Sequence, residues 1–368
     1  MTALVVSDLH LGVPSGGDIL RSESLRAGLL DRAAAADRIV LLGDIVELRE
    51  GPPGPALAAA EPVLRALGAA APGCPITIVP GNHDHRLIGR WLRTRRHREG
   101  VPLGLAESIA PAEASPEAER VAAALGAGRV EFSYPGVWLR PDVFALHGHH
   151  LDRHLTVPSF ERVGLGGVSR WGLQDRAPLT PDGYEAVFGP LYALLFALAE
   201  ESPPADGAPG AGSSTRAWRV LVGDGGKRRT AHRVAAAAGF PALIAMLNRA
   251  GLGPLSPRIS GPELRRAGLR ALHEALGNLG VAAPHVVFGH THRAGPFPGD
   301  ELAEWRRPGG GSLVNGGSWV YQSVFLGGSA PRNPYWPGNC VLVDADGPPR
   351  VERLLADVTR EDLVAALR

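Results

Sequence analysis

The segment Leu4-Val5-Val6-Ser7-Asp8-Leu9-His10 contains the pattern that decides the fold, a short β-prone apolar run that ends on an acid and a histidine. The pattern recurs at residues 37–42 (DRIVLL), which Gly43-Asp44 follows. It recurs again at residues 76–79 (ITIV), which Pro80-Gly81-Asn82-His83-Asp84 follows. Because polar groups gather at the carboxyl ends of parallel strands, these three ends are expected to meet at one edge of a sheet.

The stretches between these runs have apolar residues at helical spacing, over residues 24–36 and 56–69. Alternating strands and helices predict a largely parallel sheet with helical flanks. Two more strands are expected at 143–146 and 285–288, and the tail, at 312–320 and 340–343, is expected to supply strands of a second sheet. We therefore predict an α/β fold, a four-layer α/β/β/α sandwich of two mixed β-sheets with helices outside.

Residues 151–282 interrupt this alternation and are predicted to be a mostly helical insertion, or lid, in a core made of residues 1–150 and 283–368. The insertion contains three stretches with helical spacing and one loop rich in proline, glycine and serine. The stretches are residues 184–200, 230–249 and 261–279, and the loop is residues 202–214. The aromatic side chains of the first stretch indicate either a packed helix or an apolar lid over an acyl chain.

Composition narrows the class of protein. The net charge is +1, from 38 basic and 37 acidic residues, so no global field would attract nucleic acid, and nucleic acid is an unlikely partner. Two cysteines cannot form a disulfide framework, and no leader pattern precedes Asp8, so we expect a cytoplasmic protein. No apolar run reaches the about 20 residues of a spanning helix, which leaves a lipid-like substrate or peripheral membrane contact open. No pattern specifies an oligomeric state.

Five short polar segments, called blocks below, have the chemistry of a metal centre. They are Asp8-Leu9-His10, Gly43-Asp44, Gly81-Asn82-His83-Asp84, His147-Gly148-His149-His150 and Gly289-His290-Thr291-His292. Asp8 and His10 are two residues apart on an extended segment, so their side chains point to the same side and can hold one ion. His290 and His292, in Gly289-His290-Thr291-His292, repeat this spacing. The Asp44 carboxylate can bridge two cations, while Asn82 offers an amide oxygen and His147, in His147-Gly148-His149-His150, an imidazole. Two metals about 3.5–4 Å apart can clamp a phosphoryl oxygen and generate a hydroxide nucleophile.

Mixed nitrogen and oxygen ligands favour Mn, Fe or Zn over Mg or Ca, and we expect two divalent transition metals, with Mn first. The five blocks resemble the calcineurin-like metallophosphoesterase family, whose pattern is DxH, GD, GNH[DE], H and GHxH. The resemblance covers residues 1–150 and about 283–320, and every block is present. It implies a binuclear phosphohydrolase that acts on a small phosphomonoester, phosphodiester or pyrophosphate.

The resemblance also implies a role for each residue. One metal would be held by Asp8, His10, Asp44 and His292, and the other by Asp44, Asn82, His147 and His290. His83 would protonate the leaving alkoxide or stabilise the transition state, and Asp84 would orient His83. An imidazole beside two cations can independently be expected to supply a proton to a poor leaving group.

Within the family, the blocks are most similar to the UDP-2,3-diacylglucosamine pyrophosphatase branch, although that branch usually has Arg at position 83 and Asp at position 149. Arg293, which follows the last metal ligand, and Arg86, which opens an arginine-rich segment through Arg98, are candidate substrate-binding residues, and His149 could line the site. A solvated helix face is the alternative for the arginines. The second functional class is a nuclease of the same fold, which would use this basic segment.

Overall fold

The computed structural model describes residues 1–96, 101–126, 129–156, 179–201, 245–249, 261–326 and 332–367. The chain divides into two compact units. The first consists of Met1–His149, Leu195–Gly210 and Ala282–Arg368, and the second of His150–Leu194 and Ala211–Val281. All five polar blocks belong to the first unit, apart from the final histidine of the fourth block.

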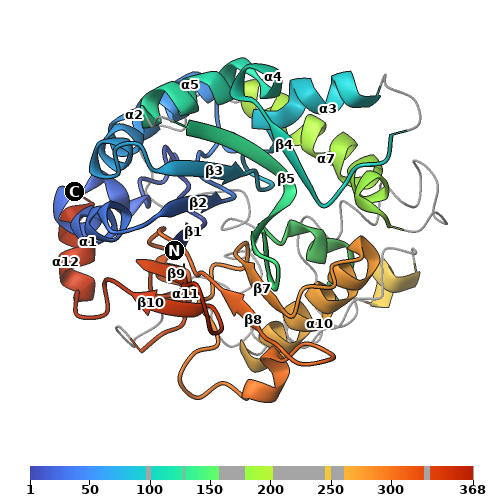
Figure 1. The fold of residues 1–368 in the computed structure, drawn as a ribbon. Helices are drawn as coiled ribbons and strands as arrows, with labels where there is room; N and C mark the ends of the chain where they lie inside the picture. The colour runs from blue at the N-terminus through green and yellow to red at the C-terminus, as the bar shows by residue number, and fades with distance from the viewer. Residues whose placement is uncertain are drawn as a thin grey trace. The chain divides into compact units, whose positions relative to one another are not determined.

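A large mixed sheet forms the centre of the first unit, with strand order β10-β9-β1-β2-β3-β5-β6-β7-β8 and with β4 paired to β5 (Figure 1). The strands are β1 Ala3–Val6, β2 Arg38–Leu42, β3 Pro75–Val79, β4 Ala106–Ile109, β5 Arg129–Arg140, β6 Val143–Leu146, β7 His285–Phe288, β8 Leu313–Asn315, β9 Asn339–Val343 and β10 Arg350–Arg353. Strands β1, β2, β3 and the first half of β5 are parallel, as are β6, β7 and β8. The mixed α/β class and the parallel strands are therefore confirmed.

Strand β5 explains how the two predicted sheets are related. Its first half pairs with β3, while its second half pairs antiparallel with β6, so both parts share one hydrogen-bonded path. Buried valines from both parts, such as Val5 and Val40 on one side and Val143 and Val287 on the other, belong to one core cluster. This cluster agrees with packing of one part against the other, and the full four-layer arrangement stays a prediction.

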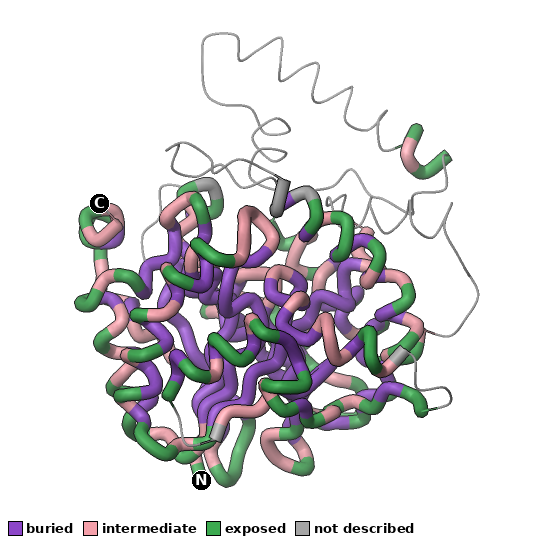
Figure 2. The backbone as a smooth tube through the Cα atoms, turned by 90° about the horizontal axis from the view of Figure 1, so that it is seen from above, coloured by how far each residue is buried: buried purple, intermediate pink, exposed green. Residues whose placement is uncertain are grey.

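Three strands of the first unit were not expected from the sequence, namely β4, β5 and β10. The prediction for the tail was also partly wrong, because β9 pairs antiparallel with β1 instead of joining β8. Alternation along β9 places Val341 and Val343 in the core cluster, which is why this strand covers the edge of β1. The residues of β1, β2, β3 and β9 are almost all buried, and Figure 2 shows several buried stretches of the backbone running alongside one another.

Helices flank the strands of the first unit, and α2 and α5 pack together on the outer side of β3 and β5 (Figure 1). The α-helices are α1 Glu23–Ala34, α2 Pro53–Ala70, α3 Gly89–Arg96, α4 Pro111–Ala114, α5 Pro116–Leu125, α11 Ser323–Leu326 and α12 Arg360–Ala366. Short 3₁₀ helices are η1 Ile19–Arg21, η2 His85–Ile88, η3 His149–Arg153 and η4 Leu302–Trp305. Ser115 caps α5 by accepting a hydrogen bond from the Ala118 amide.

The second unit contains α10, Gly261–Leu279, and most of α7, Pro181–Glu201, close to the predicted bounds. Tyr184, Phe188 and Tyr192, spaced one helical turn apart on α7, stack on one another and are buried. This burial favours the packed helix over a lid with an exposed apolar face. Most of the predicted helix at 230–249, and the loop at 202–214, lie outside the described residues. Of the helices described, none has the length and apolar character needed to cross a membrane.

The packing of α2 on α5 gives a test of the fold. A Cβ atom at Gly68 in α2 would collide with the backbone carbonyl of Leu125 at the end of α5. We expect Gly68→Ala to lower the free energy of unfolding by about 2–3 kcal/mol, because the two helices must separate. Gly54→Ala, at an open position of the same helix, should leave stability unchanged or raise it by up to about 1 kcal/mol. Urea unfolding of both variants measures the difference, and equal stabilities would contradict the helix contact.

Candidate metal centre

The predicted ligands lie on loops that follow β1, β2, β3, β6 and β7, at the carboxyl ends of these strands. Five of them have a positive φ angle, and no other non-glycine residue does so in the described part of the chain. These five are Asp8, His10, Asp44, His290 and His292, with φ between 42° and 67°. A left-handed backbone costs of order 1–3 kcal/mol at a non-glycine residue, and such strain is typical of functional sites.

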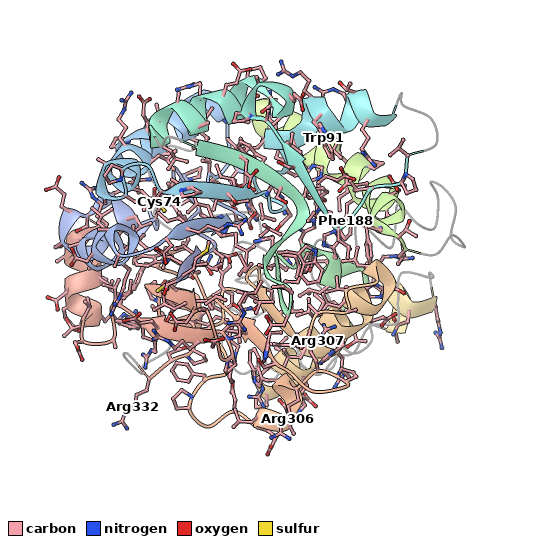
Figure 3. All side chains as sticks on the ribbon, viewed as in Figure 1. Cys74, Trp91, Phe188, Arg306, Arg307 and Arg332 are labelled. Carbon is pink, nitrogen blue, oxygen red and sulfur yellow. The ribbon has the colours of Figure 1, made fainter. Side chains whose placement is uncertain are left out.

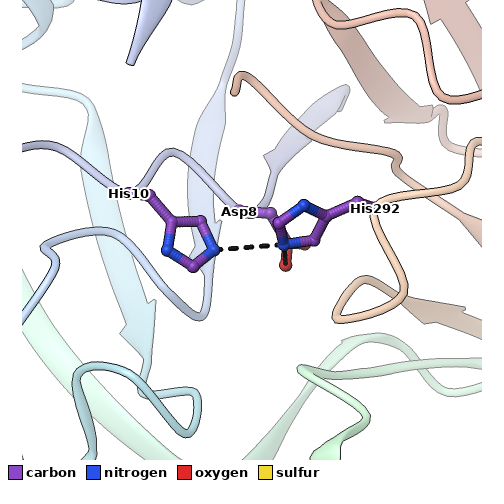
Figure 4. A group of neighbouring side chains, drawn as sticks. All are labelled: Asp8, His10 and His292. Carbon is purple, nitrogen blue, oxygen red and sulfur yellow. Dashed lines mark hydrogen bonds and ion pairs between the residues drawn. The ribbon is translucent and has the colours of Figure 1, made fainter. Parts of the chain in front are cut away.

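The first ligand group contains Asp8, His10 and His292, whose ligand atoms lie within 4.8 Å of one another (Figure 4). The Nε2 atoms of His10 and His292 are 3.1 Å apart, and His292 Nε2 is 3.4 Å from an Asp8 carboxylate oxygen. The backbone amide of His290 donates to both oxygens of Asp8, at 3.1 and 3.0 Å, and so fixes this carboxylate. Residues from opposite ends of the sequence therefore meet at one point.

The second ligand group contains Asp44, His147 and His290, together with Asn82. Asn82 Oδ1 lies 3.2 Å from His147 Nε2 and 3.1 Å from His290 Nδ1. The amide oxygen faces only acceptors in this orientation, and it also lies 3.3 Å from an Asp44 oxygen. A cation placed between these atoms would satisfy this orientation, so the orientation fits a metal ligand.

Asp44 joins the two groups through a single oxygen. Its Oδ2 lies 3.6 Å from His10 Nε2 and 3.1 Å from His147 Nε2, so it faces ligands of both groups. Its Oδ1 instead accepts a hydrogen bond from the His83 backbone amide at 2.8 Å. Oδ2 is therefore the Asp44 oxygen that faces both ligand groups, while Oδ1 is held by the backbone.

Two glycines allow this close approach. Gly43 has φ +80°, and a Cβ atom there would overlap the ring of His147. A Cβ atom at Gly289 would overlap the carboxylate of Asp8. The glycine in each of these motifs is therefore explained by the ligand that passes over its backbone.

Hydrogen bonds to residues outside the two ligand groups determine which imidazole nitrogen of each histidine faces the metal centre. His147 Nδ1 lies 3.0 Å from the Leu42 carbonyl oxygen, and this nitrogen must carry the proton because a carbonyl can only accept. His147 Nε2 is therefore the nitrogen that faces Asp44 and Asn82, and the one that a metal would bind once its proton is displaced. His10 Nδ1 lies 2.8 Å from Glu47 Oε2, which likewise leaves Nε2 directed at the ligand group.

Glu47 was not assigned a role by the sequence analysis. Its buried carboxylate lies 2.8 Å from both His10 Nδ1 and His83 Nδ1. The predicted partner of His83, Asp84, instead accepts hydrogen bonds from the backbone amides of Gly81 and Ile45, both at 2.6 Å. The hydrogen bonds thus assign the orientation of His83 to Glu47, while Asp84 fixes the two ligand-bearing loops. The position of Glu47, three residues after Asp44, is the signal that could have identified it.

The two imidazoles that face Asp44 have raised pKa values. Burial alone would lower the pKa of His10, but the hydrogen bond to Glu47 and the charge of Asp44 raise it to about 9. Burial is likewise outweighed at His147, where the Asp44 carboxylate raises the pKa to about 10. Burial, reinforced by the nearby His10, holds the pKa of His292 well below its usual range.

The carboxylates of the centre likewise have pKa values shifted in both directions. Burial raises the pKa of Asp8, and burial with the charge of Asp44 raises the pKa of Asp84 to about 6. At Asp44 the effect of burial is outweighed by His147 and His83, which hold its pKa well below its usual range. Asp44 is therefore ionised at neutral pH, as a shared metal ligand must be.

These residues fit divalent metal ions. Asp8, His10 and His292 in one group, and Asp44, His147 and His290 in the other, can each surround an ion with nitrogen and oxygen donors. His83 also lies within 4.8 Å of His10 and Asp44, measured between ligand atoms. A nitrogen and oxygen donor set of this kind suits transition metals.

The three predicted substrate-binding residues have partners within the protein. Arg293 is buried and donates to both oxygens of Asp300, at 2.9 and 2.6 Å. Arg86 donates to Glu117 at 2.9 Å. His149 is buried, with its ring stacked on Tyr134. Substrate contact by these residues stays a prediction.

The arginine-rich segment does not present an open row of charges. Arg90 lies 3.6 Å from Glu119, and Arg95 lies 3.8 Å from Glu107. Arg95 also lies over the ring of Trp91, a residue of α3 that is labelled in Figure 3. Residues 97–100 of the segment lie outside the described residues. Arg86, Arg90 and Arg95 are therefore best interpreted as helix residues paired with acids of neighbouring elements.

The raised pKa values predict how metal affinity depends on pH. With pKa values of about 9 and about 10, His10 and His147 are protonated at neutral pH in the metal-free protein, so a metal must displace their protons. We expect the apparent affinity for Mn²⁺ to rise about tenfold per pH unit for each proton released, between about pH 6 and 8. Calorimetry in two buffers of different ionisation enthalpy counts the protons, and an affinity that is constant with pH would contradict the assignment.

Comparisons with known proteins agree with this geometry. A search of the curated proteins found no match. Residues 1–179 match the model of the family described as calcineurin-like phosphoesterase. This match includes four of the five blocks, and the fifth, with His290 and His292, joins them in the structure. The match supports the metallophosphoesterase family for this chain and implies metal-dependent phosphoester hydrolysis.

Proposed function

We propose that the two ligand groups form a binuclear centre that hydrolyses a phosphomonoester, phosphodiester or pyrophosphate bond of a small molecule. The observation that carries the proposal is the convergence of lone pairs from both groups on Asp44 Oδ2. Two divalent cations, Mn first, would supply an activated hydroxide for attack on phosphorus and neutralise the charge that develops there.

His83 would supply the proton that the leaving group needs. Glu47 binds Nδ1 of His83. The Nε2 edge of the His83 ring therefore points away from Glu47. The ring is partly exposed, and it packs edge to face with His10, at 4.6 Å between ring centroids. This position suits proton donation to a departing alkoxide next to the first ligand group.

The two narrower functions, a nuclease and a UDP-linked lipid pyrophosphatase, differ in how well they are supported. A nuclease needs phosphate-binding charge, and the pairing of Arg86, Arg90 and Arg95 with glutamates does not favour it. A UDP-linked lipid pyrophosphatase is supported by the resemblance of the motifs. The burial of Tyr184 and Phe188 removes one candidate surface for acyl chains. We therefore rank hydrolysis of a small phosphoester above these two functions.

Removing the shared ligand tests the proposal. The wild type should hold Mn²⁺, hydrolyse at least one of p-nitrophenyl phosphate, its bis-ester and a UDP-linked pyrophosphate, and lose activity to a chelator. Asp44→Asn should lose metal from both groups, and with it all measurable activity, because both share Asp44 Oδ2. Asp31→Asn, an exposed acid of α1, is the control. A wild type with less than one metal per chain after reconstitution with Mn²⁺ would overturn the proposal.

The role of His83 predicts a dependence on the leaving group. His83→Gln should lower kcat by about 10²–10⁴ on an alkyl phosphate, whose alkoxide needs a proton, and much less on p-nitrophenyl phosphate. Metal content should remain at the wild-type level. Equal losses on the two substrates would show that His83 does not act as the acid.

A further inference from the structure

We propose that Asn315 is a positioning residue of the metal centre, which holds the loop of the fifth block and so places His292 in the first ligand group. Asn315 is the last residue of β8 and belongs to none of the five blocks. The proposal rests on the proposed function only for the two metal ions, because its test measures metal binding and not hydrolysis.

The side chain of Asn315 is fully buried, and both of its polar atoms have partners. Nδ2 donates to the Gly289 carbonyl at 2.9 Å and to the Thr291 hydroxyl at 3.0 Å. Oδ1 accepts a hydrogen bond from the Gly317 amide at 2.9 Å. Because a carbonyl can only accept and a backbone amide can only donate, these partners fix the orientation of the Asn315 amide. The side chain therefore binds the fifth block on both sides of His290.

The backbone of Asn315 holds the other end of the same loop. Its amide donates to the Gly295 carbonyl at 2.7 Å, and its carbonyl accepts from the Gly295 amide at 3.1 Å. The loop of residues 289–295 is thus bound to Asn315 at its start, at Thr291 and at its end. His292 lies between the last two of these contacts.

The loop needs such contacts because its backbone is strained. His290 and His292 both have a left-handed backbone, with φ of 67° and 56°. Such conformations persist only where the surrounding structure fixes them. Thr291, which accepts from Asn315, lies between these two residues. Asn315 therefore contributes to keeping both histidines in this conformation.

The two histidines depend on Asn315 to different degrees. His290 is also held directly, because its backbone amide donates to both oxygens of the Asp8 carboxylate, at 3.1 and 3.0 Å. His292 follows Thr291, which is held through Asn315. Loss of the Asn315 side chain is therefore expected to displace His292 more than His290, and to weaken the first ligand group more than the second.

The segment that follows Asn315 contacts the other side of the first ligand group. The Trp319 amide donates to the Asp8 carbonyl at 2.9 Å, and the Gly317 amide donates to Asn315 Oδ1. Asn315 thus links this segment to the loop that carries His292. In the first ligand group the side chains of Asp8 and His292 lie next to each other (Figure 4). The Asn315 amide therefore helps to set their relative position.

The alternative is that Asn315 only stabilises the fold. Truncation of any buried asparagine removes hydrogen bonds and lowers the free energy of unfolding. Asn339 offers a matched control, because it is also buried and its Nδ2 donates to a carbonyl outside the blocks, that of Trp336, at 2.6 Å. Asn339→Ala should lower stability without a selective loss of metal.

The test counts Mn²⁺ ions bound to the full chain by electron paramagnetic resonance. The wild type should bind two ions and give the spectrum of a spin-coupled pair. Asn315→Ala should weaken one of the two sites by about tenfold to hundredfold, so that a single uncoupled ion remains. Thr291→Val, which removes the hydroxyl that accepts from Asn315, should weaken the same site to a smaller extent. Thr291→Ser, which keeps the hydroxyl, should retain both ions.

Double variants identify the weakened site. In a His147→Ala background, which disables the second ligand group, Asn315→Ala should weaken binding of the remaining ion by about tenfold to hundredfold. In a His10→Ala background, which disables the first group, the same change should alter binding by no more than about twofold.

Hydrogen exchange of the metal-free protein gives a second measurement. The Thr291 amide donates to the Gly289 carbonyl at 2.7 Å, and the Gly295 amide donates to Asn315. Both amides should exchange about tenfold faster in Asn315→Ala, because the loop opens locally. Exchange in β1, β2 and β3 should change only as much as it does in Asn339→Ala.

The outcomes separate this proposal from the proposed function. Mn²⁺ binding by Asn315→Ala within about twofold of the wild type at both sites, or an equal loss at both, would overturn the role of Asn315 alone. If Asn315→Ala does not fold, identical binding by Thr291→Val and Thr291→Ser would overturn it instead. A wild type that binds two Mn²⁺ ions and hydrolyses none of the phosphoesters would overturn only the proposed function. A wild type that binds fewer than two ions would overturn both.

Discussion

The structure depends on the convergence of ligand lone pairs around Asp44 Oδ2. Histidine nitrogens and an amide oxygen approach this atom from loops that follow different strands, at 3.1–3.6 Å. Without a metal, the surrounding fold and the protons of His10 and His147 hold these contacts, and five ligands occupy left-handed backbone conformations to make them. Strain at these residues persists because the strands before each loop are buried and paired, so the scaffold determines where each loop begins.

A second set of contacts connects this scaffold to chemistry. Glu47 determines which nitrogen His10 and His83 present, and its other hydrogen bonds fix the backbone at Arg49. Its charge remains buried because the two imidazoles outweigh the cost of burial and hold its pKa below the usual range. One side chain thus couples a metal ligand to the proposed acid. A change at Glu47 would disturb several functions together, and these cannot be assigned to it as separate additive effects.

The sequence predicted those parts of the fold whose signals are local. Strands β1 to β3 have continuous apolar runs, and α10 has regular apolar spacing between clear ends, so both were placed correctly. Strand β5 was missed because Pro135-Gly136 in its interior has the composition of a turn. In the structure β5 pairs with β3 up to Phe132 and with β6 from Gly136 onward. Such a change of partner depends on tertiary contacts, which periodicity does not contain.

At the site, the blocks predicted which residues lie together. Which hydrogen-bond partner each side chain has could be seen only in the structure. The family resemblance implied that Asp84 would orient its neighbour His83, but the backbone amides of Gly81 and Ile45 donate to the two oxygens of Asp84. The arginine-rich segment similarly suggested a phosphate site, yet Arg86, Arg90 and Arg95 pair with glutamates. Charge density along a sequence is therefore a poor guide to electrostatic potential when oppositely charged residues fold beside it.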